Sequence, residues 1–168
     1  MAGDQPDGYE DARRIALRRL ATRARSTGEV GEYLRREQVP EPAIQAVIDR
    51  FTAVGLLDDA AFARSWVEER QRAKSAGASQ LRRELVAKGI DEAIIGEVLA
   101  GGTRPDDEVA LDLARRRIRA MSGLDKATQT RRLAGQLARR GFAPSVVRRV
   151  VARVVGESSG DGSIGDHE

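Results

Sequence analysis

The chain has 168 residues, of which 33% are charged and 40% are hydrophobic, a balance that favours several small cores over one large core. It contains no cysteine and a single histidine, His167, so disulfides, thiolate chemistry and cysteine-ligated zinc are excluded. No apolar stretch reaches the length of a membrane span, and the N-terminal residues lack the pattern of a secretion signal. We therefore expect a soluble, cytoplasmic protein with no membrane partner.

The first group of elements begins with a helix carrying Ile15, Leu17 and Leu20. Ser26 and Glu29 then have the spacing of a capping box, which predicts a second helix that ends near Gln38. We expect Gly31 to interrupt this short helix. Pro40 and Pro42 mark the start of a third helix, which closes at Gly55.

The second group has the same three-helix plan. Asp58 is expected to cap its first helix, in which Phe62 and Trp66 lie one turn apart. These aromatic side chains could stack on bases, but their spacing favours packing against neighbouring helices. Gly89 predicts a left-handed C-terminal cap, and Asp91 starts the sixth helix.

The third group carries the same boundary signals. They stand at Thr103 with Asp106, and at Asp125, Gly141, Pro144 and Gly156. The acidic pairs Asp58–Asp59 and Asp106–Asp107 are interpreted as residues of helix N-termini, where negative charge is favoured, rather than as metal or acid–base groups.

An apolar pattern recurs through these three groups. The segments Leu34–Val39, Leu85–Ile90 and Leu137–Phe142 each place a leucine five residues before a second apolar residue, at offsets of 51 and 52 residues. Such a period indicates stacked units. The sequence therefore predicts an all-α fold of three tandem three-helix repeats, at residues 12–58, 59–102 and 103–156, in an elongated, curved array.

The two ends of the chain differ from the repeats in charge. Residues 1–11 and 157–168 carry four acids each and no Lys or Arg, and we expect both segments to be disordered. Removing these eight negative charges from the net charge of +3 leaves +11 for residues 12–156. This surplus favours a polyanionic partner, although a solvated arginine surface would give the same composition.

The basic residues concentrate in the third repeat, where thirteen bases face five acids. If they contact phosphates, affinity should fall steeply with salt. Around Gly141 the pattern is similar to the turn of a DNA-reading helix-turn-helix, with the ninth helix as the reader. The candidate contact residues are Arg82, Arg83 and Lys88 in the second repeat, and Arg131, Arg132, Arg139, Arg140, Arg148 and Arg149 in the third.

Catalytic patterns are missing from the sequence. There is no cysteine nucleophile, no histidine outside the tail and no phosphate-binding glycine loop. We therefore expect a protein that is not an enzyme and that has no cofactor, no metal and no small-molecule substrate.

Several motifs together resemble the RecX family of bacterial recombinase regulators over about residues 12–155. They are Arg23 to Ser26, Gly55-Leu56-Leu57-Asp58-Asp59, Phe62-Ala63 with Trp66-Val67, and Arg82 to Ile90. The resemblance implies tandem three-helix repeats that bind the RecA recombinase filament and inhibit its ATP hydrolysis and strand exchange. The chain departs from the family pattern at Glu37-Gln38, where Lys-Gly is expected, and at Ala78-Ser79, where a Gly-Pro-like turn is expected.

Two other functions stay open. The first is a stand-alone protein that binds single- or double-stranded DNA through phosphate contacts of the third repeat, with Arg148 and Arg149 as its key residues. The second is a passive helical scaffold, which predicts neither polyanion binding nor any effect on a recombinase.

Overall fold

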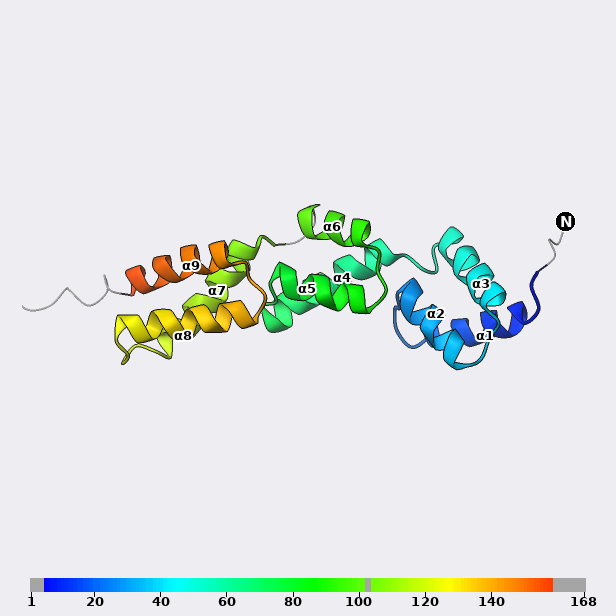
Figure 1. The fold of residues 1–168 in the computed structure, drawn as a ribbon, viewed down its shortest axis with the longest axis horizontal. Helices are drawn as coiled ribbons and strands as arrows, with labels where there is room; N and C mark the ends of the chain where they lie inside the picture. The colour runs from blue at the N-terminus through cyan, green and yellow to red at the C-terminus, as the bar shows by residue number, and fades with distance from the viewer. Residues whose placement is uncertain (1–4, 102–103, 159–168) are drawn as a thin grey trace, which may run out of the picture. The chain divides into compact units, whose positions relative to one another are not determined.

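The computed structural model describes residues 5–101 and 104–158, and in these ranges it contains nine α-helices and no strand (Figure 1). The helices are α1 (Tyr9–Leu20), α2 (Thr27–Arg36), α3 (Glu41–Ala53), α4 (Asp59–Lys74), α5 (Ala78–Ala87), α6 (Glu92–Gly101), α7 (Asp106–Arg119), α8 (Lys126–Arg139) and α9 (Pro144–Glu157). The prediction of an all-α fold with three groups of three helices is confirmed. The expected boundary at Thr103, and residues 1–4 and 159–168 of the two acidic termini, lie outside the described residues.

The helices pack into two compact units. Within the described residues, one unit comprises residues 5–66 and 84–101, and the other comprises residues 67–83 and 104–158. The second sequence repeat is therefore divided, because α4 and α5 each contribute to both units. A group of about fifty residues buries little apolar surface alone, so packing between neighbouring groups is expected to add stability. The curved, elongated arrangement of the repeats stays a prediction.

The core of the first unit is formed by α1, α2 and α3. Its fully buried side chains include Val30, Leu34, Ile44 and Val47. Tyr9 is only 7% exposed and packs into the same core. Tyr9 is the first residue of α1, so this helix begins inside the segment 1–11 that was expected to be disordered.

The start of α2 has the expected capping box. The Ser26 hydroxyl accepts a hydrogen bond from the Glu29 backbone N–H at 3.0 Å, and the Ser26 backbone N–H donates to the Glu29 carboxylate at 3.3 Å. The helix then continues through Gly31, so the expected interruption there was wrong. A Cβ at this position would lie 3.3 Å from Ile48 Cδ1, so the glycine permits the close approach of α3 instead.

The three segments that share the apolar pattern also share a backbone conformation. Gln38, Gly89 and Gly141 have φ angles of +60°, +73° and +82°, and each stands just after the end of α2, α5 or α8. The left-handed caps predicted from glycine are confirmed at Gly89 and Gly141. In the first repeat a glutamine occupies the same position, where a side chain with a Cβ is disfavoured.

The core of the second unit is formed by α7, α8 and α9. Leu113, Leu133, Leu137 and Phe142 pack there against the valines of α9. The last helix extends to Glu157, one residue into the segment 157–168 that was expected to be disordered.

The first unit contains a close backbone contact, which we call the first joint, between Ser26–Thr27–Gly28 and Asp59 with Lys88–Gly89. The Ser26 hydroxyl donates to the Lys88 carbonyl at 2.6 Å, and the Thr27 N–H donates to the Asp59 carboxylate at 2.8 Å. A Cβ on Gly28 would stand 2.6 Å from the Lys88 carbonyl oxygen. This joint fixes the start of α2 against the start of α4 and the segment just after α5.

The second unit contains the corresponding contact, the second joint, between Gly77–Ala78–Ser79 and Asp106 with Arg140–Gly141. The Gly77 N–H donates to the Arg140 carbonyl at 2.8 Å, and the Ala78 N–H donates to the Asp106 carboxylate at 3.1 Å. A Cβ on Gly77 would lie 2.7 Å from the Gly141 backbone. Ser26 and Gly77 are 51 residues apart, and Lys88 and Arg140 are 52 apart, so the sequence period corresponds to a repeated joint.

Candidate partner-binding surface

Arg82, Arg83 and Lys88 are the candidate contacts of the second repeat, and they have different surroundings. Arg82 and Arg83 are exposed on α5. The Lys88 ammonium lies 2.9 Å from Glu29 Oε1 and 4.0 Å from the centroid of the Trp66 ring, and its side chain is only 17% exposed. Lys88 is therefore built into the first joint.

Glu29 is the ion-pair partner of Lys88 in this cluster. Burial raises the pKa of its carboxyl, but hydrogen bonds from Lys88 and Arg23 and the charge of Lys88 outweigh this effect, so the pKa is lowered overall. The carboxylate remains charged and holds the Lys88 ammonium in place.

Phe62 and Trp66, which could have formed a platform for bases, pack inside the first unit. Their ring centroids are 6.1 Å apart, with an angle of 15° between the planes. Phe62 is buried, and the Trp66 indole N–H donates to the Glu84 carboxylate at 2.9 Å. The packing role that their spacing favoured is confirmed.

The acidic pairs do more than cap their own helices. Asp58 accepts from the Ala61 N–H at 2.8 Å, as expected of a helix cap. Asp59 and Asp106 instead accept from Thr27 and Ala78 across the two joints. These long-range partners could not be predicted from local spacing, although both residues are the first of their helices.

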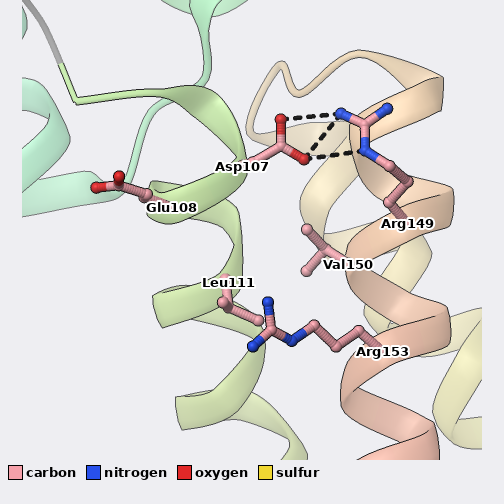
Figure 2. Close-up of a pocket in the computed structure, with 6 residues that line it drawn as sticks. All are labelled: Asp107, Glu108, Leu111, Arg149, Val150 and Arg153. Atoms are coloured by element: carbon pink, nitrogen blue, oxygen red, sulfur yellow. Dashed lines mark hydrogen bonds and ion pairs between the residues drawn. The ribbon is translucent and has the colours of Figure 1, made fainter.

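Asp107, the fourth acid of these pairs, is the partner of a candidate arginine. The Arg149 guanidinium donates to both oxygens of the Asp107 carboxylate at 2.8 and 2.9 Å, as Figure 2 shows. The pair closes one end of a cavity of about 330 Å³ between α7 and α9, with Leu111, Val150 and Arg153 further along its lining. The two arginines of this cavity have acidic partners, because Arg153 also donates to Glu157 at 2.9 Å.

The bases of α8 are arranged differently. The helix has no acidic residue. We call its Lys126, Arg131, Arg132 and Arg139, together with Arg140 just after its end, the α8 basic set. Within residues 5–101 and 104–158, none of these side chains has an ion pair or a side-chain hydrogen bond, and the same holds for Arg148. The tertiary structure thus separates Arg115, Arg149 and Arg153, which have acidic partners, from the uncompensated bases of the α8 basic set.

A second cavity of this unit, which we call the α7–α8 pocket, has a volume of about 260 Å³. It is lined by Leu113, Arg117, Gln136, Arg139 and Arg140. Arg139 and Arg140 were candidate residues, but Arg117 was not among them. Its position four residues after Leu113, whose side chain is buried against α8, is the signal that could have placed it beside this helix.

Two further features concern metals and membranes. Among the described residues, no group of three or more His, Cys, Asp or Glu side chains is arranged to hold a metal ion. No helix in the described ranges is both long and apolar enough to cross a bilayer.

Comparison with known proteins finds a match for each of the three repeats. Three family models match the chain in order: the first three-helix domain of RecX at residues 12–51, the second at 58–99 and the third at 105–151. Two solved structures share the fold. A RecX from Lactobacillus salivarius has a TM-score of 0.80 at 22% identity and covers 88% of this chain and 97% of its own. Another regulatory protein RecX has a TM-score of 0.74 at 24% identity, over 86% of this chain and 73% of its own.

Curated relatives are similar over most of their length. The regulatory protein RecX of Streptomyces coelicolor is 40% identical over 161 residues, which is 95% of this chain and 86% of the relative. Those of Thermobifida fusca and Mycobacterium avium are 38% and 39% identical, over 86% and 88% of this chain and 79% and 86% of the relatives. The chain belongs to the RecX family.

Proposed function

We propose that this protein binds the RecA recombinase filament and inhibits its ATP hydrolysis and strand exchange, and so modulates recombination and DNA repair. The observation that carries the proposal is the presence of all three RecX domains, in order, in one chain. The protein acts in the cytoplasm as a binding partner, without a cofactor and without chemistry of its own.

Tandem repeats suit a filament because a filament presents the same surface many times. Once one repeat is bound, the effective concentration of the next is high, so several weak contacts produce tight binding. The exposed Arg82 and Arg83 on α5 are proposed to contact the recombinase. The surplus positive charge of the third repeat is proposed to attract the negatively charged nucleoprotein filament. Recognition of the recombinase would then belong mainly to the second repeat, and electrostatic attraction mainly to the third.

The test is to measure RecA ATPase and strand exchange on single-stranded DNA with increasing amounts of this protein. Both activities should fall as the protein approaches stoichiometry with the filament. No change in either activity at stoichiometric excess would overturn the proposal.

A matched pair of variants identifies the contact surface. The double substitution Arg82→Ala/Arg83→Ala should weaken inhibition, because both side chains are exposed on α5. Arg13→Ala/Arg14→Ala removes the same charge from α1, where both arginines pair with acids of the same helix, and should inhibit like the unmodified protein. Equal inhibition by both variants would remove Arg82 and Arg83 from the proposed surface.

The alternative of stand-alone DNA binding through Arg148 and Arg149 has less support from the geometry. Arg149 is held by Asp107, and the apolar face of α9 is buried in the core of the second unit. A DNA contact by Arg149 would compete with this ion pair.

A further inference from the structure

The α7–α8 pocket gathers three guanidinium groups without an acid among its lining residues. Arg117 comes from α7, Arg139 from the last turn of α8, and Arg140 from the residue after it. In the described part of the chain, none of the three has an ion pair or a side-chain hydrogen bond. Like charges are costly to hold together, so such a cluster is a site where an anion would be stabilised.

The guanidinium group identifies the kind of anion. Its planar fork of N–H donors matches the oxygens of a phosphate group and can bind them in pairs. Gln136 also lines the pocket and carries no charge, so nothing in the lining opposes an anion.

The surroundings of the pocket favour a polymer over a single phosphate ion. Arg132, Gln136 and Arg139 follow one another at helical spacings of four and three residues, so they form one row along α8. Arg131 and Lys126 extend the uncompensated charge toward the start of the helix. A free phosphate would use only the pocket, whereas a strand with regularly spaced phosphates would also use this row.

We propose that the α7–α8 pocket binds phosphodiester groups of a nucleic-acid strand, with Arg117, Arg139 and Arg140 as the phosphate contacts. The contacts are to the backbone, so binding carries little sequence preference. The inference goes beyond the proposed regulation of the recombinase, and it is tested in the absence of RecA. Failure of nucleic-acid binding by the pocket can therefore be distinguished from failure of the proposed inhibition of RecA.

The experiment measures fluorescence anisotropy of a labelled single-stranded oligonucleotide with the full chain, over a range of salt concentrations. The pocket variant is Arg117→Ala/Arg139→Ala/Arg140→Ala. The matched control is Arg115→Ala/Arg149→Ala/Arg153→Ala, which removes three arginines of the same unit that have acidic partners. Both variants lower the formal net charge by three, so they differ only in which arginines are lost.

The pocket variant should bind at least about tenfold more weakly, and the slope of log affinity against log salt should fall by about two to three, one for each lost phosphate contact. The control variant should keep most of the affinity and the slope. Equal losses in the two variants would mean that net charge alone governs binding and would overturn the site. Circular dichroism checks the helical content, and the single variants Arg117→Gln and Arg139→Gln replace the triple variant if it is not folded.

Competition distinguishes the possible sources of the anion. Unlabelled DNA, single-stranded or duplex, should displace the probe from the unmodified protein and much less effectively from the pocket variant. Tripolyphosphate and poly-glutamate are added at matched concentrations of negative charge. Displacement by either as effective as that by DNA would overturn the assignment to a nucleic-acid strand.

Discussion

The Ser26 hydroxyl donates a hydrogen bond to the Lys88 carbonyl across 62 residues, at 2.6 Å. The same hydroxyl accepts from the Glu29 N–H, so one side chain both caps α2 and joins it to the end of α5. In the second joint the corresponding donor is a backbone group, since the Gly77 N–H donates a hydrogen bond to the Arg140 carbonyl. The accepting carbonyl stands just after α5 in the first joint and just after α8 in the second. The donor is a side-chain hydroxyl in the first joint and a backbone N–H in the second.

Replacing Gln38 by glycine should stabilise the protein. Gln38 is exposed and has a φ of +60°, a conformation that costs a residue with a Cβ about 1 kcal/mol and glycine much less. We expect Gln38→Gly to raise the free energy of unfolding by roughly 1 kcal/mol, measured by urea denaturation. The reverse change, Gly55→Ala, provides the control, since Gly55 has a φ of +74° and open space around it. It should lower stability by a similar amount, and a destabilised Gln38→Gly variant would contradict the argument.

Alanine at Gly77 should disrupt the second joint. The new methyl group would lie 2.7 Å from the Gly141 backbone, which cannot move aside as a flexible side chain could. We expect a loss of roughly 1–3 kcal/mol in the free energy of unfolding, the usual range for overpacking. Gly96→Ala is the matched control, because Gly96 lies within α6 with nothing near its missing Cβ, and alanine there should stabilise by up to about 1 kcal/mol.

Lys88 and Glu29 should be energetically coupled. Both side chains are largely buried, at 17% and 18% exposure, and the Lys88 ammonium also faces the Trp66 ring. Lys88→Met and Glu29→Gln should each lower stability, and the double variant should lose less than the sum, by about 1 kcal/mol. Trp66 is the only tryptophan in the chain, so its fluorescence can follow unfolding of the first unit. Strict additivity would show that the pair contributes nothing as a pair.

The pH dependence of stability should change when Asp106 becomes Asn. Burial raises the pKa of the Asp106 carboxyl despite the hydrogen bond from Ala78, and the charge of Asp107 adds to the rise. With a folded pKa above the unfolded value of about 4, the contribution of this group is fully present below that pH and is lost as the pH rises through the folded pKa. Asn keeps an acceptor oxygen but cannot ionise. Relative to the unmodified protein, Asp106→Asn should therefore become more stable as the pH rises through this window.

Urea unfolding at several pH values checks this, and Asp112→Asn serves as a control of opposite sign. The hydrogen bond from Arg104, aided by its charge, lowers the pKa of Asp112 even though desolvation opposes the shift. Its stabilising contribution is thus present above about pH 4 and is lost as the pH falls through the folded pKa. A stability difference between Asp106→Asn and the unmodified protein that is constant with pH would rule out the raised pKa.

Local signals in the sequence predicted most of the helix boundaries, and they were wrong where a distant partner decided the outcome. The capping box at Ser26 and the left-handed caps at Gly89 and Gly141 depend on neighbouring residues, so they could be identified from the chain itself. Gly31 was expected to interrupt α2, but the helix continues through it. The absence of a Cβ at Gly31 leaves room for Ile48 of α3. Packing between helices is not visible in local spacing.

The sequence by itself determined that the protein is helical, that it has three repeats of one pattern and that its positive charge concentrates in the third, because these properties follow from residue type and period. Only the tertiary structure decided which charges remain uncompensated. It brings Asp107 to Arg149 and Glu157 to Arg115 and Arg153, and it leaves Arg117, Arg139 and Arg140 together without an acid. Charge neutralisation requires contact within a few ångströms, and such contacts between residues about forty positions apart are set by how the helices pack.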